Sequence, residues 1–163
     1  MLTLAASAYE WVLPIHIIAV VIAFGWTFAL PVVFAVASKT DPRSLPVLHR
    51  VEVVVSRFML NPALLVILLA GIFMASDGHH WKEFFVQWGL GVVIVIGGLV
   101  GGVLIPASKR AEESSRSDLA RWDGTGEFEP GEQYTAAVRR LTTVGSLASG
   151  LVLVTIVIMA VKP

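Results

Sequence analysis

One histidine lies well inside a long apolar stretch of this sequence. His16 stands about six positions, or roughly 9 Å along a helix axis, from the start of a run that opens near Trp11. In a membrane helix, a titratable group at that depth faces other helices or water, and it marks a functional site by default. Imidazole ligates haem iron, copper and zinc. His16 is therefore a candidate axial ligand of haem or a metal, and the alternative is a hydrogen bond to a neighbouring helix, with Gln87 as the obvious partner.

The surroundings of His16 follow helical spacing. His16, Ala19, Ala23 and Thr27 share one face that is small apart from the histidine. A bulky stripe runs beside it and contains Ile17, Val21, Phe24 and Phe28. The small face suits close helix packing or a flat ligand with His16 at its edge, and the bulky face suits lipid.

A second candidate site contains a carboxylate and two imidazoles within four residues. Asp77, His79 and His80 stand in a short segment between two apolar runs. Nitrogen and oxygen donors of this kind suit Cu(II), Ni(II) or Zn(II). The alternative is a plain solvated turn, because adjacent histidines do not always converge on one ion.

Small residues form a third pattern, near the middle and the end of the chain. Close approach of helix backbones in lipid depends on small residues four apart. Two such pairs fall in the third apolar run and one in the fourth: Gly97 with Gly101, Gly98 with Gly102, and Gly145 with Ser149. They predict packing of the third helix on the fourth, and the alternatives are homo-oligomerisation or contact with another membrane partner through these helices, or room for a porphyrin face.

The elements that must position these residues follow from composition. Of 163 residues, 56% are hydrophobic and 15% charged, with a mean hydropathy of +0.79, which excludes an ordinary water-soluble globule. The apolar residues fall into four runs, each close to the roughly 20 residues that span a bilayer. We expect one all-α domain over residues 1–163, a transmembrane four-helix bundle with helices near 9–37, 57–75, 83–107 and 140–161.

Basic residues are unevenly distributed between the connecting segments. Loops 38–56 and 108–139, with their immediate flanks, contain ten of the twelve Lys and Arg residues. The positive-inside rule therefore predicts two cytoplasmic loops and both termini outside. Arg50 and Arg57 lie seven apart, so that on a helix both could reach lipid phosphate. We expect a charged helical extension from Lys109 to Trp122, followed by a turn-rich acidic segment.

Several other functions are disfavoured. The formal net charge is zero, so nucleic acid is not an expected partner. Gly124-Thr-Gly126 lacks the strand and lysine context of a phosphate loop, so no nucleotide site is expected. The chain lacks cysteine, a Ser/His/Asp set and paired intramembrane carboxylates. Enzyme chemistry would thus need a borrowed cofactor, and we do not expect an enzyme.

The first helix carries a family resemblance. The segment from Trp11 to Gly25, with Ala29-Leu-Pro31, resembles the opening helix of an uncharacterised family of bacterial integral membrane proteins, domain of unknown function 2269. That family is similar to copper-resistance-D-type proteins and to four-helix protoporphyrinogen oxidases. The oxidase resemblance implies that His16 binds haem b. Those oxidases also use a lysine on the third helix, for which His80-Trp81-Lys82 is only loosely similar in order and position.

Together these observations predict a multi-pass protein of the bacterial plasma membrane that has the lipid bilayer as its main contact. Its expected role is haem b or metal association, with copper or zinc as the less favoured ligands. The alternatives are a non-catalytic assembly subunit and a protein of copper or metal transport.

Overall fold

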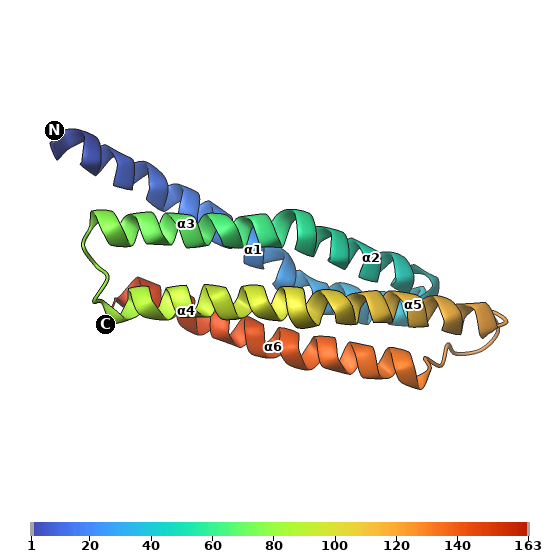
Figure 1. The fold of residues 1–163 in the computed structure, drawn as a ribbon. Coiled ribbons are helices and arrows are strands. Elements are labelled where there is room, and N and C mark those ends of the chain that lie inside the picture. The colour runs from blue at the N-terminus through green and yellow to red at the C-terminus, as the bar shows by residue number, and fades with distance from the viewer. Residues whose placement is uncertain (1, 163) are drawn as a thin grey trace.

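The computed structural model describes residues 2–162, with side chains from Ala8 onward. The protein is 88% helical, and no strand occurs in the described part. Four long helical segments, called here rods, run along one another in Figure 1: Ala8–Thr40, Pro42–Asp77, Phe84–Arg121 and Glu132–Val161. Each is long and apolar enough to cross a membrane. The elements in chain order are α1 (Leu2–Thr40), η1 (Pro42–Ser44), α2 (Leu45–Val55), η2 (Ser56–Leu60), α3 (Asn61–Asp77), α4 (Phe84–Leu99), η3 (Val100–Leu104), α5 (Ile105–Arg121) and α6 (Glu132–Val161). The predicted all-α, four-helix class is confirmed.

The two ends of the bundle differ in what they contain. Both termini and the 78–83 turn lie at one end, called here the terminal end (Figure 1). The opposite end, called the basic end, contains α2, α5, the start of α6 and the loop 122–131. Helix continues through much of the two segments expected as loops: α2 occupies 45–55, α5 reaches Arg121, and α6 begins at Glu132. The charged helical extension and the turn-rich segment after it are present.

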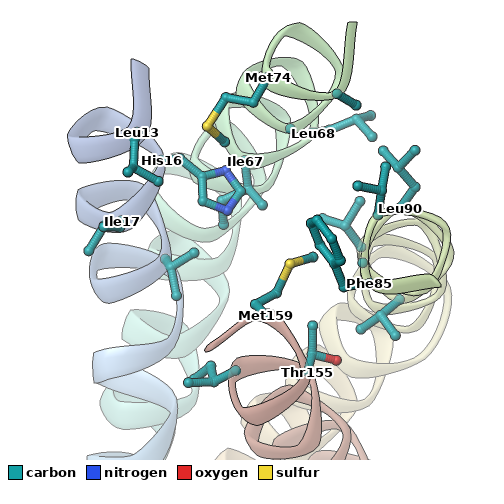
Figure 2. Close-up of a pocket in the computed structure, with 18 of the residues that line it drawn as sticks. Leu13, His16, Ile17, Ile67, Leu68, Met74, Phe85, Leu90, Thr155 and Met159 are labelled. Atoms are coloured by element: carbon teal, nitrogen blue, oxygen red, sulfur yellow. The ribbon is translucent and has the colours of Figure 1, made fainter. Parts of the chain in front are cut away.

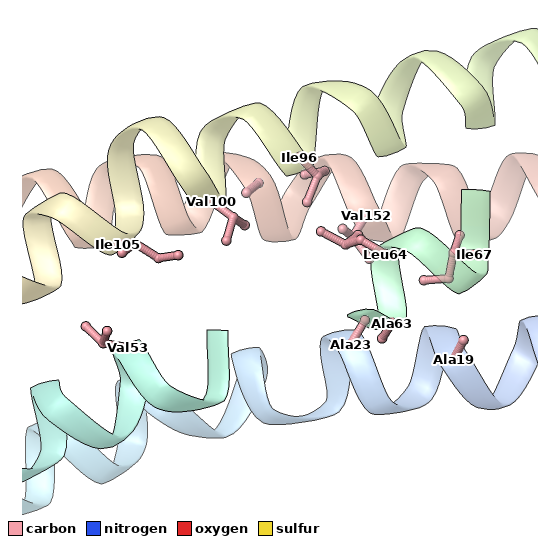
Figure 3. Packing of buried hydrophobic residues seen from close by; sticks show 11 residues of the cluster. Ala19, Ala23, Val53, Ala63, Leu64, Ile67, Ile96, Val100, Ile105 and Val152 are labelled. Carbon is pink, nitrogen blue, oxygen red and sulfur yellow. The ribbon is translucent and has the colours of Figure 1, made fainter. Parts of the chain in front are cut away.

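One apolar core runs through the middle of the bundle, and Figure 3 shows its side chains. The small face of α1 is buried there, with Ala19 and Ala23 packed in the same cluster as Leu64 and Ile67 of α3. Ile17 and Val21, from the bulky stripe, are exposed, but both also border a cavity, and Phe24 of the same stripe packs against the core. The small stripe is therefore used for packing as predicted, and the bulky stripe faces outward only in part.

Two of the rods are interrupted by π-helical segments just before a proline. The segment Ser56–Leu60 precedes Asn61-Pro62, and Val100–Leu104 precedes Ile105-Pro106. Proline lacks the N–H for a regular helix bond, and its ring collides with the carbonyl four residues earlier. Widening the preceding turn accommodates the ring while the helix continues. The second and third rods thus continue from the membrane core into the basic end.

The basic end is closed by a polar cluster built around His49, a residue not singled out as a site from the sequence. His49 is only 2% exposed, and its ring stacks on Phe34 of α1 with centroids 4.5 Å apart. Its Nδ1 lies 3.4 Å from a Glu52 carboxylate oxygen, and its Nε2 lies 3.3 Å from the Tyr134 hydroxyl of α6. His49 therefore joins α1, α2 and α6, with both ring nitrogens in polar contact.

A second polar contact fixes the loop that leads into α6. The Asp118 carboxylate is buried on α5 and accepts a hydrogen bond from the Gly131 N–H at 2.8 Å. It also accepts one from the Arg121 guanidinium. Because buried carboxylates are costly unless paired, this double contact holds the end of α5 and the start of α6 together.

Candidate functional site: a cavity at the terminal end

A cavity of about 590 Å³ lies among α1, α3, α4 and α6, towards the terminal end. Figure 2 shows side chains from all four helices entering it, including Leu13, Ile67, Leu68, Phe85 and Leu90. Most of its wall is apolar. The polar side chains that line it are Tyr9, His16, His80, Thr155 and Lys162.

The cavity exists because the four helices are unevenly packed. Helix α1 packs mainly along α3 and makes few contacts with α6, while α4 is packed against both α3 and α6. The α1–α6 side of the bundle is therefore the loosely packed one. Two lining positions, Gly71 of α3 and Gly89 of α4, are glycines and contribute no side chain of their own to the wall.

His16 is the polar group that the cavity leaves unsatisfied. Its Nδ1 atom is buried and has no hydrogen-bond partner among the described residues, a state shared only with Trp26 Nε1. The backbone of Ile67 lies against the ring, and a Cβ built on Gly71 would stand 4.0 Å from His16 Cε1. The imidazole thus lies between α1 and α3, facing the cavity as Figure 2 shows.

Gln87 is not the partner of His16 that we expected from the sequence. Its side chain is exposed, and its amide donates to the Trp81 carbonyl at 3.2 Å. The residue lies near the start of α4, where it closes the turn rather than facing the cavity. The neighbouring Trp88 contacts α6, where its indole donates to the Thr155 hydroxyl at 3.0 Å.

Two methionines that we did not single out from the sequence also line the cavity. Met74 comes from α3 and Met159 from α6. The methyl group of Met159 fills the space beside Gly89, so that any Cβ at Gly89 would collide with it. Methionine is common in apolar runs, and only the tertiary arrangement brings these two thioethers near an imidazole.

The three metal-ligand candidates of the terminal turn do not form a cluster. Asp77, His79 and His80 are all exposed, and His79 adopts a left-handed backbone with φ of 56°. No group of three His, Cys, Asp or Glu side chains in the described chain could hold a metal ion. His80 instead lines the cavity, with its ring centroid 6.3 Å from that of Phe85.

The glycine pairs lie away from any close contact within the chain. A Cβ built on Gly97, Gly98, Gly101, Gly102 or Gly145 meets nothing within 4 Å. Gly98, Gly101 and Gly102 are exposed, whereas Gly97, Gly145 and Ser149 are partly buried. Helices α4 and α6 do pack on each other, but not by the close approach at these residues that the spacing predicted.

Arg50 and Arg57 are both exposed on the rod that enters the membrane from the basic end. Their side chains are free to extend outward from α2 and η2. This position is compatible with lipid head groups, and that contact stays a prediction.

Comparison with known proteins identifies the family. The family model described as "Predicted integral membrane protein (DUF2269)" matches residues 10–163, nearly the whole chain. The chain belongs to this family. No curated protein and no solved structure matches it. Membership and the four apolar helices establish an integral membrane protein, in a family whose biochemical role is unknown.

The cavity has the size and polarity of a ligand site. Ligand pockets are mostly apolar, with a few polar groups that fix orientation, and they occupy roughly 300–1,000 Å³. Here the imidazoles of His16 and His80 border a large apolar space.

The imidazoles of His16 and His49 make opposite predictions for stability. In ligand-free protein, His49→Leu should lower the free energy of unfolding by about 1–3 kcal/mol, because Tyr134 and Glu52 lose their partner. His16→Leu should leave it unchanged or raise it, because Nδ1 makes no hydrogen bond. Denaturant unfolding in detergent, followed by tryptophan fluorescence, measures both. An equal loss in the two variants would show that His16 is structural.

Proposed function

We propose that this protein binds haem b in the terminal-end cavity, with His16 as an axial ligand. The observation that carries the proposal is the imidazole of His16, which lines an apolar cavity and has a buried Nδ1 atom without a hydrogen-bond partner. Burying a polar group without a hydrogen bond costs roughly 1–3 kcal/mol in proteins. A ring that the fold itself uses so little is available to ligate haem iron, and the resemblance of the first helix to four-helix oxidases supports the same role.

The cavity fits the shape and polarity of this group. Haem has a broad apolar face and two carboxylates at one edge. The apolar wall would cover the face, while Tyr9, His80 and Lys162 lie at the terminal end of the cavity, where the carboxylates would reach them. The Lys162 ammonium already lies 5.8 Å from the centre of the Phe85 ring, over the cavity wall.

The residues of the chain would hold and shield the group. His16 would fix its height in the membrane, and the weakly packed α1–α6 side would admit a flat ligand from the bilayer. The apolar lining would exclude water from the iron. Bound haem supplies one-electron redox chemistry, so a role in redox reactions or cofactor handling follows. Haem is favoured over copper or zinc because the imidazoles of the terminal turn do not gather around a common point.

A visible spectrum tests the proposal. Protein purified in detergent from haem-replete cells should show a Soret band with one haem per chain. His16→Ala should abolish the band, whereas His49→Ala, at the other end of the bundle, should keep it in whatever fraction stays folded. A colourless wild-type preparation, or a His16→Ala variant with full haem content, would overturn the proposal.

We also propose that the protein lies in the bacterial plasma membrane with both termini outside. Support comes from the ten basic residues at the basic end and from the exposed Trp11, Trp81 and Phe84 near the terminal end, since aromatic rings settle at membrane interfaces.

Orientation can be measured directly because the chain has no cysteine. In intact cells stripped of any outer membrane, a membrane-impermeant maleimide should label Asp77→Cys and leave Glu127→Cys unlabelled. Both positions are exposed, at opposite ends of the bundle. Labelling of Glu127→Cys alone would reverse the proposed orientation.

A second candidate role is assembly with another membrane helix through the face that contains Gly98, Gly101 and Gly102. The specific observation is that these glycines are exposed and have open space where a Cβ would stand. Two of them lie in the π segment η3, so the backbone is accessible where the regular helix is interrupted. Close backbone approach of this kind drives helix association in lipid.

Gly101→Leu separates assembly from folding. Gly101 is exposed and a Cβ built there meets nothing within 4 Å, so thermal stability in detergent should stay unchanged. Chemical crosslinking in membranes should show the complex of the wild type weakened at least several-fold. If crosslinking is unchanged, the glycine face is not an interface. Ala136→Leu, on an exposed position of α6 at the basic end, serves as the control.

A further inference from the structure

Met159 enters the cavity from the side opposite to the α1–α3 pair. It lies two residues before the end of α6 at Val161, and Figure 2 shows its thioether between His16 and Phe85. Helices α1 and α6 make few contacts with each other, and His16 and Met159 both line the cavity beside them.

A glycine places this thioether. The Met159 methyl group occupies the position where a side chain on Gly89 would begin, and the Met159 sulfur stands 3.8 Å from that position. An alanine at Gly89 would collide with the methyl group and push the thioether away. The pairing of Gly89 with Met159 therefore sets how far the sulfur reaches into the cavity.

Met74 has a different relation to the imidazole. It comes from α3, the helix against which α1 packs most closely, and so it flanks His16 rather than facing it across the cavity. Two axial ligands of one iron must lie on opposite faces of the porphyrin. By this geometry Met159, and not Met74, is the residue opposed to His16.

We propose that Met159 is the second axial ligand of the haem iron that His16 holds. This inference rests on the proposed function. A thioether sulfur is a known partner of histidine on haem iron, and it raises the reduction potential relative to bis-histidine ligation. The cavity would then hold a six-coordinate haem with His16 from α1 and Met159 from α6, joining the two helices that are otherwise weakly packed.

Three variants of the haem-loaded full-length protein test the assignment. Met159→Leu keeps the volume but removes the sulfur, so haem content should stay while the ferric spectrum changes from low-spin to high-spin. Met159→His should restore the low-spin spectrum with a lower reduction potential than the wild type. Gly89→Ala should shift the spectrum towards that of Met159→Leu, because it displaces the thioether.

Met74→Leu is the matched control and should leave both spectrum and potential unchanged. If haem binds but Met159→Leu has the wild-type spectrum and potential, the second ligand is another residue and the haem proposal stands. If Met74→Leu instead produces the spin change, the geometry has been assigned to the wrong methionine. Absence of haem from the wild type would overturn the proposed function, and this inference with it.

Discussion

The hydrocarbon interior of a membrane offers no hydrogen bonds, so every polar group placed there must find its partner inside the protein. This constraint accounts for the four rods, because helices satisfy their own backbone. It also accounts for the position of the polar residues. The network of His49, Glu52 and Tyr134 and the Asp118 contacts all lie at the basic end, where both ring nitrogens of His49 and both carboxylate oxygens of Asp118 have partners. His16 breaks the rule, since its buried Nδ1 has no partner in the described chain.

The two ends of the bundle therefore differ in how closely their helices pack. At the basic end, aromatic stacking and buried hydrogen bonds join α1, α2, α5 and α6 into a closed unit. At the terminal end α1 and α6 contact each other little, and glycines widen the space between the rods. A closed end can hold the four helices in register while the other end retains a cavity. The π segments before Pro62 and Pro106 lie between these regions. Through them the second and third rods continue from the terminal end into the basic end.

Much of this arrangement follows from sequence because it depends on local pattern. The four apolar runs predict the rods, and the 3.6-residue period of α1 separates the buried Ala19 and Ala23 from the exposed Ile17 and Val21. The cavity position of His16 follows from the same face. Contacts between distant residues carry no such signal: Tyr134 lies 85 residues from His49, and nothing local marks the pair. His49 and Glu52 are three residues apart on a helix, and that spacing by itself indicates only a pair on the protein surface. For the same reason Gln87 was assigned to His16 by depth, whereas turn geometry directs it to Trp81.

The most direct test of haem binding by His16 is native mass spectrometry of the full-length protein, released gently from membranes of haem-replete cells. We expect the wild type to carry a single non-covalent adduct with the mass of haem b, which leaves on collisional activation. If His16 is the haem ligand, as proposed, His16→Leu should carry none, and it should keep its fold because Nδ1 has no hydrogen-bond partner in the described chain. An absent adduct in the wild type, or the same adduct in both proteins, would contradict the claim that this imidazole is kept for a ligand.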